Sequence, residues 1–97
     1  MYIITVIFSV YKSNVEEFTL LVAKQASDSL EKEKECLIFD VSIGEENNGI
    51  IPFFLYEVYS DKSSFDTHLN MDYFHEFSNK VSGIVANKTV NSWNKIN

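Results

Sequence analysis

The sequence predicts one α+β domain with four strands and two helical segments in the order β-α-β-β-α-β. Three observations support this fold class: strand-like apolar runs near both ends of the chain, an amphipathic helical segment after the first run, and two further apolar runs around a polar turn. Of the 97 residues, 45% are hydrophobic and 14% aromatic, which is enough for one core and too few for a second domain. We therefore treat residues 1–97 as a single domain.

The first strand is predicted at residues 1–11, because β-branched and aromatic side chains fill both sets of alternating positions. Ser13 and Glu16 form a capping-box pattern, which places the start of a helix directly after that strand. Apolar residues then recur at helical spacing for about five turns, namely Val15, Phe18, Val22, Ala26 and Leu30. Charged residues 31–35 are interpreted as the solvated end of the helix.

The second and third strands are predicted at residues 36–43 and 53–59, and the polar turn at 44–49 should join them as a hairpin. Asp61 and Ser63 are candidate N-caps of a second helical segment, which continues or restarts through residue 81. The last strand is predicted at residues 89–96.

This order is the split βαβ pattern of ferredoxin-like folds, a four-stranded antiparallel sheet with both helical segments on one face. The first and third strands are apolar on both faces, whereas the helices can cover only one. A large exposed apolar face is unusual in a monomer. We therefore expect a homodimer, in which a second copy covers the other face.

Charge and composition argue against several classes of partner. Fourteen acidic residues oppose eight lysines, the net charge is −6 and arginine is absent, so nucleic acid is not an expected partner. The apolar stretches are too short to cross a membrane, and the single cysteine, Cys36, cannot form an intramolecular disulfide and should pack as a small hydrophobe. No secretion signal is evident, so a cytoplasmic location is expected. Without a CxxC, HExxH or glycine-rich phosphate motif, neither a metal nor a nucleotide cofactor is expected.

Three blocks of the sequence resemble the antibiotic biosynthesis monooxygenase family. Their letters are EKECLIFDV at residues 33–41, FLYEVY at 54–59, and FDTHL at 65–69 followed by Tyr73-Phe74. The family pattern is E-x-G-C-L-x-Y-x-V, a strand ending in Y-E-x-W or Y-E-x-Y, and a helix with H-L before an aromatic pair. Glu35 stands where the family has glycine, so the exit from the first helix is expected to differ locally.

The resemblance implies a dimeric α+β barrel with the two sheets facing each other and a pocket between sheet and helices in each subunit. Family members include cofactor-free oxygenases of quinols and anthrones, and an isomerase of a phosphorylated autoinducer. In haem-degrading relatives, an asparagine, a tryptophan and an axial histidine would fall near Thr5, His68 and Ser78. None of the three is kept, so haem is not expected.

His68 and Glu57 are the candidate catalytic residues. His68 shares a helical face with Phe65 and Leu69, so it should point inward as a general base or as a hydrogen-bonded core residue, and the resemblance favours the base. Asp72 either orients its ring or is solvated, and His75 should be solvated. Glu57 lies in an apolar strand, where a carboxylate is disfavoured unless it serves a pocket or pairs with a lysine at an edge or dimer contact.

A set of aromatic residues could form either core or the walls of a pocket for a flat substrate: Phe39, Tyr56, Tyr73, Phe74 and Phe77. The leading functional hypothesis is a cofactor-independent monooxygenase that oxidises a small phenol or quinol with molecular oxygen. The alternatives are an isomerase of a small hydroxyketone and a non-catalytic dimeric module that binds a small apolar ligand. A phosphorylated substrate would need lysines such as Lys34 or Lys12.

Overall fold

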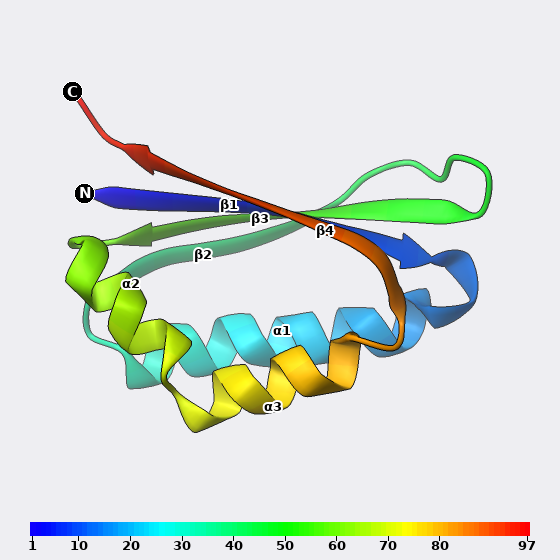
Figure 1. The fold of residues 1–97 in the computed structure, drawn as a ribbon, viewed down its shortest axis with the longest axis horizontal. Helices are drawn as coiled ribbons and strands as arrows, with labels where there is room; N and C mark the ends of the chain where they lie inside the picture. The colour runs from blue at the N-terminus through cyan, green and yellow to red at the C-terminus, as the bar shows by residue number, and fades with distance from the viewer.

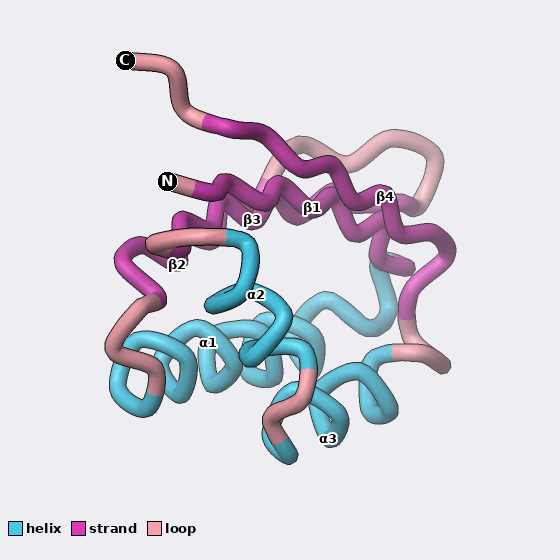
Figure 2. Tube along the Cα trace, turned by 60° about the vertical axis from the view of Figure 1, so that its left-hand side comes forward, coloured by secondary structure: helices cyan, strands magenta, loops and turns pink.

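In the computed structural model, which describes residues 1–97, four strands form one antiparallel sheet in the order β2-β3-β1-β4. The strands are β1 (Tyr2–Tyr11), β2 (Cys36–Ile43), β3 (Ile50–Tyr59) and β4 (Val85–Asn94), and the helices are α1 (Val15–Lys32), α2 (Lys62–Leu69) and α3 (Asp72–Val81). All helices lie on one face of the sheet (Figure 1, and from a second direction Figure 2). The predicted ferredoxin-like α+β fold is therefore confirmed.

The second helical segment restarts, so the full order is β-α-β-β-α-α-β. Asp61 caps α2, because its side chain accepts a hydrogen bond from the backbone nitrogen of Ser64 at 2.8 Å. The chain leaves the helical conformation at Met71, which has φ −73° and ψ 140°, and α3 begins at the next residue. The chain changes direction at this break. As a result α2 lies near the end of the sheet where the two chain termini are, whereas α3 lies beside α1 (Figure 1).

The predicted capping box at the start of α1 is wrong. Ser13 lies within a short 3-10 helix, Lys12–Asn14, and Asn14 precedes α1 without a side-chain capping bond. The buried face of α1 also differs from the prediction, since Leu30 is exposed. The buried positions are Phe18, Val22, Gln25 and Ser29. These four residues recur at helical spacing and form one buried stripe along α1. Leu30 is the residue after Ser29 and lies about a third of a turn round the helix from that stripe.

Two strands are longer or shifted relative to the sequence prediction. β3 begins at Ile50 rather than residue 53, because Ile50 pairs with Tyr11 at the far end of β1. Asn48 (φ 52°) and Gly49 (φ 80°) make the preceding turn in the left-handed region. β4 begins before residue 89 because it pairs along nearly the whole length of β1, and it ends at Asn94 opposite Tyr2.

The core lies between the sheet and the helices. The ring of Phe18 on α1 is 5.1 Å from that of Phe8 on β1 and 4.7 Å from that of Phe53 on β3, measured between centroids. The opposite face of the sheet carries Ile7, Phe54 and Trp93, which are between 42% and 54% exposed. This chain therefore leaves one apolar face of its sheet without helices. No helix has the length and hydrophobicity needed to cross a membrane.

Candidate active site

A cavity of about 330 Å³ lies between the sheet and the helices. Most of its lining is hydrophobic, with Ile4, Val6 and Phe8 of β1 along the sheet side and Phe74, Phe77 and Val81 of α3 along the helix side. Few polar or charged residues reach it: Gln25, Glu57, His68, Ser78, Ser82 and Lys88. Its volume and its sparse polar groups are typical of a site for a small organic ligand.

His68 lies on the wall of this cavity and is 2% exposed. It comes from the last turn of α2, whose N-cap at Asp61 fixes the start of the helix. Its Nδ1 is 2.8 Å from Oε2 of Glu33, at the C-terminal end of α1. A carboxylate at Nδ1 favours the tautomer in which Nδ1 carries the proton, so Nε2 is left as the basic nitrogen.

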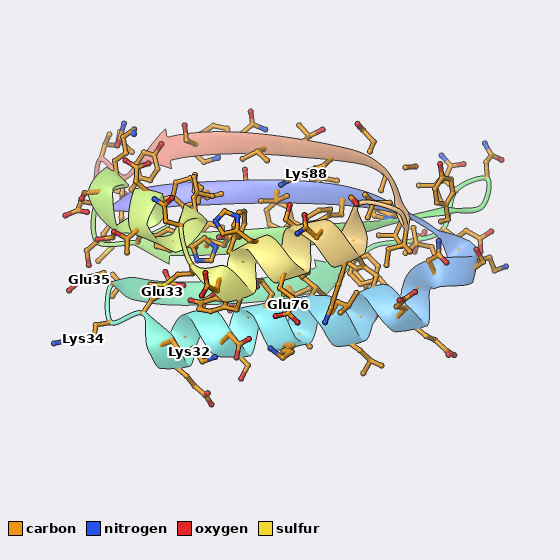
Figure 3. All side chains as sticks on the ribbon, turned by 60° about the horizontal axis from the view of Figure 1, so that its bottom comes forward. Lys32, Glu33, Lys34, Glu35, Glu76 and Lys88 are labelled. Atoms are coloured by element: carbon orange, nitrogen blue, oxygen red, sulfur yellow. The ribbon has the colours of Figure 1, made fainter.

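Glu33 is the main correction to the sequence interpretation of residues 31–35 as a solvated helix end. It is 7% exposed, whereas its neighbours Lys34 and Glu35 are exposed. Figure 3 shows Lys34 pointing away from the molecule, whereas Glu33 lies inside it, at the end of α1 and against His68 of α2. The reason is the exit from α1: Glu33 is already extended, with φ −119° and ψ 104°, and this directs its side chain toward α2.

The hydroxyl of Tyr73 also donates a hydrogen bond to Oε2 of Glu33, so one carboxylate oxygen serves both residues. Aromatic rings surround the imidazole: the centroid of Phe74 is 5.1 Å away, that of Tyr59 5.4 Å and that of Phe65 6.0 Å. The histidine is thus held by one charged partner inside an apolar environment. This arrangement can accept a proton and stabilise the resulting imidazolium through Glu33.

Glu57 reaches the same cavity from β3 and is buried. Its Oε1 accepts a hydrogen bond of 2.6 Å from the hydroxyl of Tyr59. Burial raises the pKa of the Glu57 carboxyl to about 7, although the Tyr59 bond and the charge of Lys88 act in the opposite direction. A carboxyl with this pKa is present in both protonation states at neutral pH. Glu57 forms no ion pair with a lysine of this chain, which was one of the two roles predicted for it from the sequence.

The aromatic candidates divide into two groups. Phe39, Phe74 and Phe77 line the cavity, while Tyr56 and Tyr73 do not. Tyr56 pairs with Thr5 and Asp40 in the sheet, and this register turns its side chain to the face opposite the helices. Tyr73 contacts Glu33 rather than the cavity. The lining of this cavity in the single chain therefore gives no support to the ligand contacts expected of these two tyrosines.

Other residues of interest also have defined places. The ring of His68 is held by Glu33 rather than by Asp72, which is exposed. Lys12 pairs with Glu46 at 3.1 Å, and the cationic residue that reaches the cavity is Lys88 of β4 rather than Lys12 or Lys34.

Burial raises the pKa of the Cys36 thiol to about 12, which keeps it protonated and unreactive. No three His, Cys, Asp or Glu side chains gather in an arrangement that could hold a metal ion.

Sequence reasoning missed Glu33, Gln25 and Lys88 as site residues. Glu33 did have a signal, since it begins the EKECLIFDV block that carries the family resemblance. Gln25 had only its helical spacing from Phe18 and Val22, which places it on the buried stripe. The position of Lys88 depends on the register of β4 against β1, where it lies opposite Phe8, and that register was not predictable locally.

Solved structures with the same fold match this chain over 98% or more of its length. A protein from Nitrosomonas europaea, provisionally named an antibiotic biosynthesis monooxygenase, superposes with a TM-score of 0.89 at 19% identity, and the match covers 100% of each chain. A similarly named protein from Caulobacter crescentus gives 0.90 at 15% identity over 99% of this chain and 90% of the other. A conserved protein from Methanosarcina mazei gives 0.85 at 25% identity over 98% and 92%.

At these identities the first two likenesses establish the fold alone. The search of curated proteins found no match. The sequence itself carries the stronger statement, since residues 1–80 match the family described as antibiotic biosynthesis monooxygenase. That span contains β1 through α2 and all of α3 except its last residue, and it includes His68, Glu33 and Glu57. The chain therefore belongs to the antibiotic biosynthesis monooxygenase family.

Proposed function

We propose that this protein is a monooxygenase that works without a bound cofactor and oxidises a small electron-rich phenol or quinol with molecular oxygen. Family membership supports the reaction class. The observation that carries the proposal is the buried contact of 2.8 Å between His68 and Glu33 on the wall of an apolar cavity of about 330 Å³. It supplies a base inside a space that favours an organic ring over water.

In the first step, Nε2 of His68 takes the proton of the substrate hydroxyl. The products are a phenolate and an imidazolium, and the negative charge of Glu33 stabilises the imidazolium through Nδ1. The phenolate is far more electron-rich than the neutral phenol. The hydrophobic walls exclude water, which would otherwise stabilise the phenolate and reduce its reactivity.

In the second step, the phenolate transfers one electron to oxygen, and the two radicals join at a ring carbon that carries a hydrogen. The proton on His68 is returned to the peroxide, giving a hydroperoxide, which loses water to form a carbonyl. One oxygen atom enters the product and the other leaves as water. All four electrons come from the substrate, so the reaction needs no separate reductant.

The first experiment measures oxygen uptake with a panel of phenols, quinols and hydroxyketones, and uses ¹⁸O₂ to follow one labelled atom into the product. With an active substrate, His68→Ala should lower turnover by about 100-fold or more, the usual contribution of a positioned base. His75→Ala is the matched control, because His75 is the other histidine and is exposed on α3. Its turnover should match that of the wild type.

The same variant distinguishes the rival functions. If His68 is only a core residue, His68→Ala should lower the thermal midpoint while turnover per folded molecule is unchanged, and the proposal fails. Glu57 gives one specific reason to retain the isomerase as a second candidate, because a carboxyl with a pKa of about 7 can return a proton that His68 removes. A hydroxyketone converted without oxygen consumption would favour that function.

A further inference from the structure

Gln25 carries a buried polar group that the structure leaves unused. Its side chain projects from the inward stripe of α1, is 3% exposed and lines the cavity. Its Nε2 is the one buried side-chain nitrogen or oxygen in the chain without a hydrogen-bond partner. A buried unpaired amide costs folding free energy, and a methionine or leucine would fit the stripe without that cost.

Nearby carboxylates do not provide the missing partner. On its other side Gln25 borders a small hollow that also contains Asp28 and Glu76. Asp28 binds Lys24 at 2.7 Å, and Glu76 binds Lys80 at 2.8 Å. Both carboxylates are thus paired with surface ammonium groups, and neither accepts a hydrogen bond from Nε2 of Gln25. Gln25 also lines the cavity, and a ligand bound there can bring the acceptor that the protein itself does not supply.

We infer that Gln25 is a substrate-positioning contact, whose carboxamide donates a hydrogen bond to a carbonyl or phenolate oxygen of the ligand in the cavity. The two ends of a carboxamide have nearly the same size, and a half-turn about its last side-chain bond exchanges them with little steric cost, so the NH₂ group of Gln25 can be presented to the cavity that this residue lines. The ligand oxygen then satisfies the amide nitrogen that has no hydrogen-bond partner within the protein. The inference deepens the proposed function, because it states that the substrate presents an acceptor oxygen to α1 while His68 acts from α2.

Binding of two matched probes tests this role without any turnover. 1-Tetralone and tetralin share one bicyclic frame, and only the ketone carries an acceptor oxygen. Calorimetric titration of the wild-type protein should show tighter binding of the ketone by about tenfold, the usual effect of satisfying a buried donor. In Gln25→Met this preference should disappear, while tetralin binds as well as before or better.

Ser82→Ala is the control, because Ser82 also lines the cavity but its hydroxyl already donates to the backbone oxygen of Asn79 at 2.9 Å. It should keep the preference for the ketone. Gln25→Met should also raise the thermal midpoint of the ligand-free protein, since it removes an unpaired amide. Gln25→Leu repeats both measurements if the methionine variant does not fold.

The inference would be overturned if the wild type bound both probes equally. It would also be overturned if Gln25→Met and Gln25→Leu kept the preference for the ketone, whether or not their thermal midpoints changed. A lower thermal midpoint in both variants, together with a retained preference, is the third contradicting result. The last result would mean that the amide pairs with a protein group in solution. None of these results depends on oxygen chemistry. If no compound of the substrate panel consumes oxygen, the monooxygenase proposal fails, but the comparison of the two probes can still be made. If the probes bind equally, the role of Gln25 fails, but the monooxygenase proposal is unaffected.

Discussion

The contact between Glu33 and His68 joins residues 35 positions apart in the sequence. Each side chain explains the burial of the other. A buried carboxylate is costly unless donors satisfy it, and Glu33 receives hydrogen bonds from the His68 ring and the Tyr73 hydroxyl. Removing Glu33 would leave the imidazole without its partner inside an aromatic enclosure, so Glu33 is a positioning residue for the proposed base.

Glu33→Gln should lower kcat by about 10-fold to 100-fold with little change in KM, because a neutral amide stabilises the imidazolium much less while the cavity walls stay in place. Steady-state kinetics on the active substrate measures both constants. Glu35→Gln is the matched control: Glu35 is exposed two residues away in the same charged run (Figure 3), and its kinetics should not change. Equal losses in both variants, or a change confined to KM, would contradict the positioning role.

Glu57 should make the stability of the fold depend on pH. The unfolded chain releases this proton near the usual pKa of 4.5, whereas the folded protein holds it until about pH 7. Between these values the unfolded state binds fewer protons, so the free energy of unfolding falls as pH rises. The fall attributable to this group is about 3 kcal/mol, since one pKa unit corresponds to about 1.4 kcal/mol.

Glu57→Gln tests this dependence, because the amide oxygen can still accept the bond from Tyr59 but does not titrate. Urea unfolding at pH 5 and pH 8 should show the variant gaining stability relative to the wild type at the higher pH. Asp40→Asn is the control, an exposed carboxyl on the neighbouring strand β2. If the wild type and Glu57→Gln lose stability in parallel between the two pH values, burial does not shift this group.

At the scale of the elements, the N-terminus of α2 depends on one side chain. Oδ1 of Asp61 accepts bonds of 2.8 Å from both the backbone nitrogen and the hydroxyl of Ser64. These bonds lower the pKa of Asp61, so its capping contribution is present above pH 3.8 and is lost as pH falls through the lowered value. Because α2 ends at His68 and Leu69, fraying of this helix would also disturb the proposed base.

Asp61→Ala should lower the thermal midpoint by several degrees at neutral pH, with a smaller effect in strong acid. Ser13→Ala is the informative comparison, because the sequence pattern marks Ser13 as a cap and the structure gives it no capping bond. Differential scanning calorimetry should show no shift for Ser13→Ala. A larger loss for Ser13→Ala than for Asp61→Ala would reverse the assignment of caps.

At the scale of the whole molecule, the helices cover only one face of the sheet (Figure 1, Figure 2). The other face presents Ile7, Phe54 and Trp93 to solvent in the single chain. Trp93 is held there by a bond of 2.9 Å from its indole nitrogen to the hydroxyl of Thr5. We propose that a second copy packs on this face, because an exposed apolar surface of this kind favours association.

Ile7→Lys should shift the protein toward the 11.2 kDa monomer, because it places a charge in the middle of that face. Sedimentation at micromolar concentration measures the shift, and the fluorescence of Trp93 should move toward that of a solvated indole. Leu20→Lys is the control, an exposed leucine on α1 away from the sheet. A wild-type protein that sediments as a monomer would contradict the proposed dimer.

Local sequence patterns predicted most of the elements. Alternation of side chains gave β1 and β2 to within a residue, and the polar turn gave the β2-β3 hairpin. The boundaries of β3 and β4 were less accurate, because a strand ends where its partner ends, and the partner of both is β1. The inward direction of His68 followed from helical spacing, and the structure buries it.

The sequence by itself determined the fold class, the side of α2 that carries His68 and the family, because these depend on spacing along the chain. Tertiary structure alone decided what each polar group meets. Glu33 looked like one charge among five, and only the packing of the end of α1 against α2 buries it beside His68. The position of Tyr56 outside the cavity has a similar cause. The alternation of side chains along β3 divides them between two faces of the sheet, but only the packed sheet, with β3 paired to β1 and β2, shows which face the helices cover.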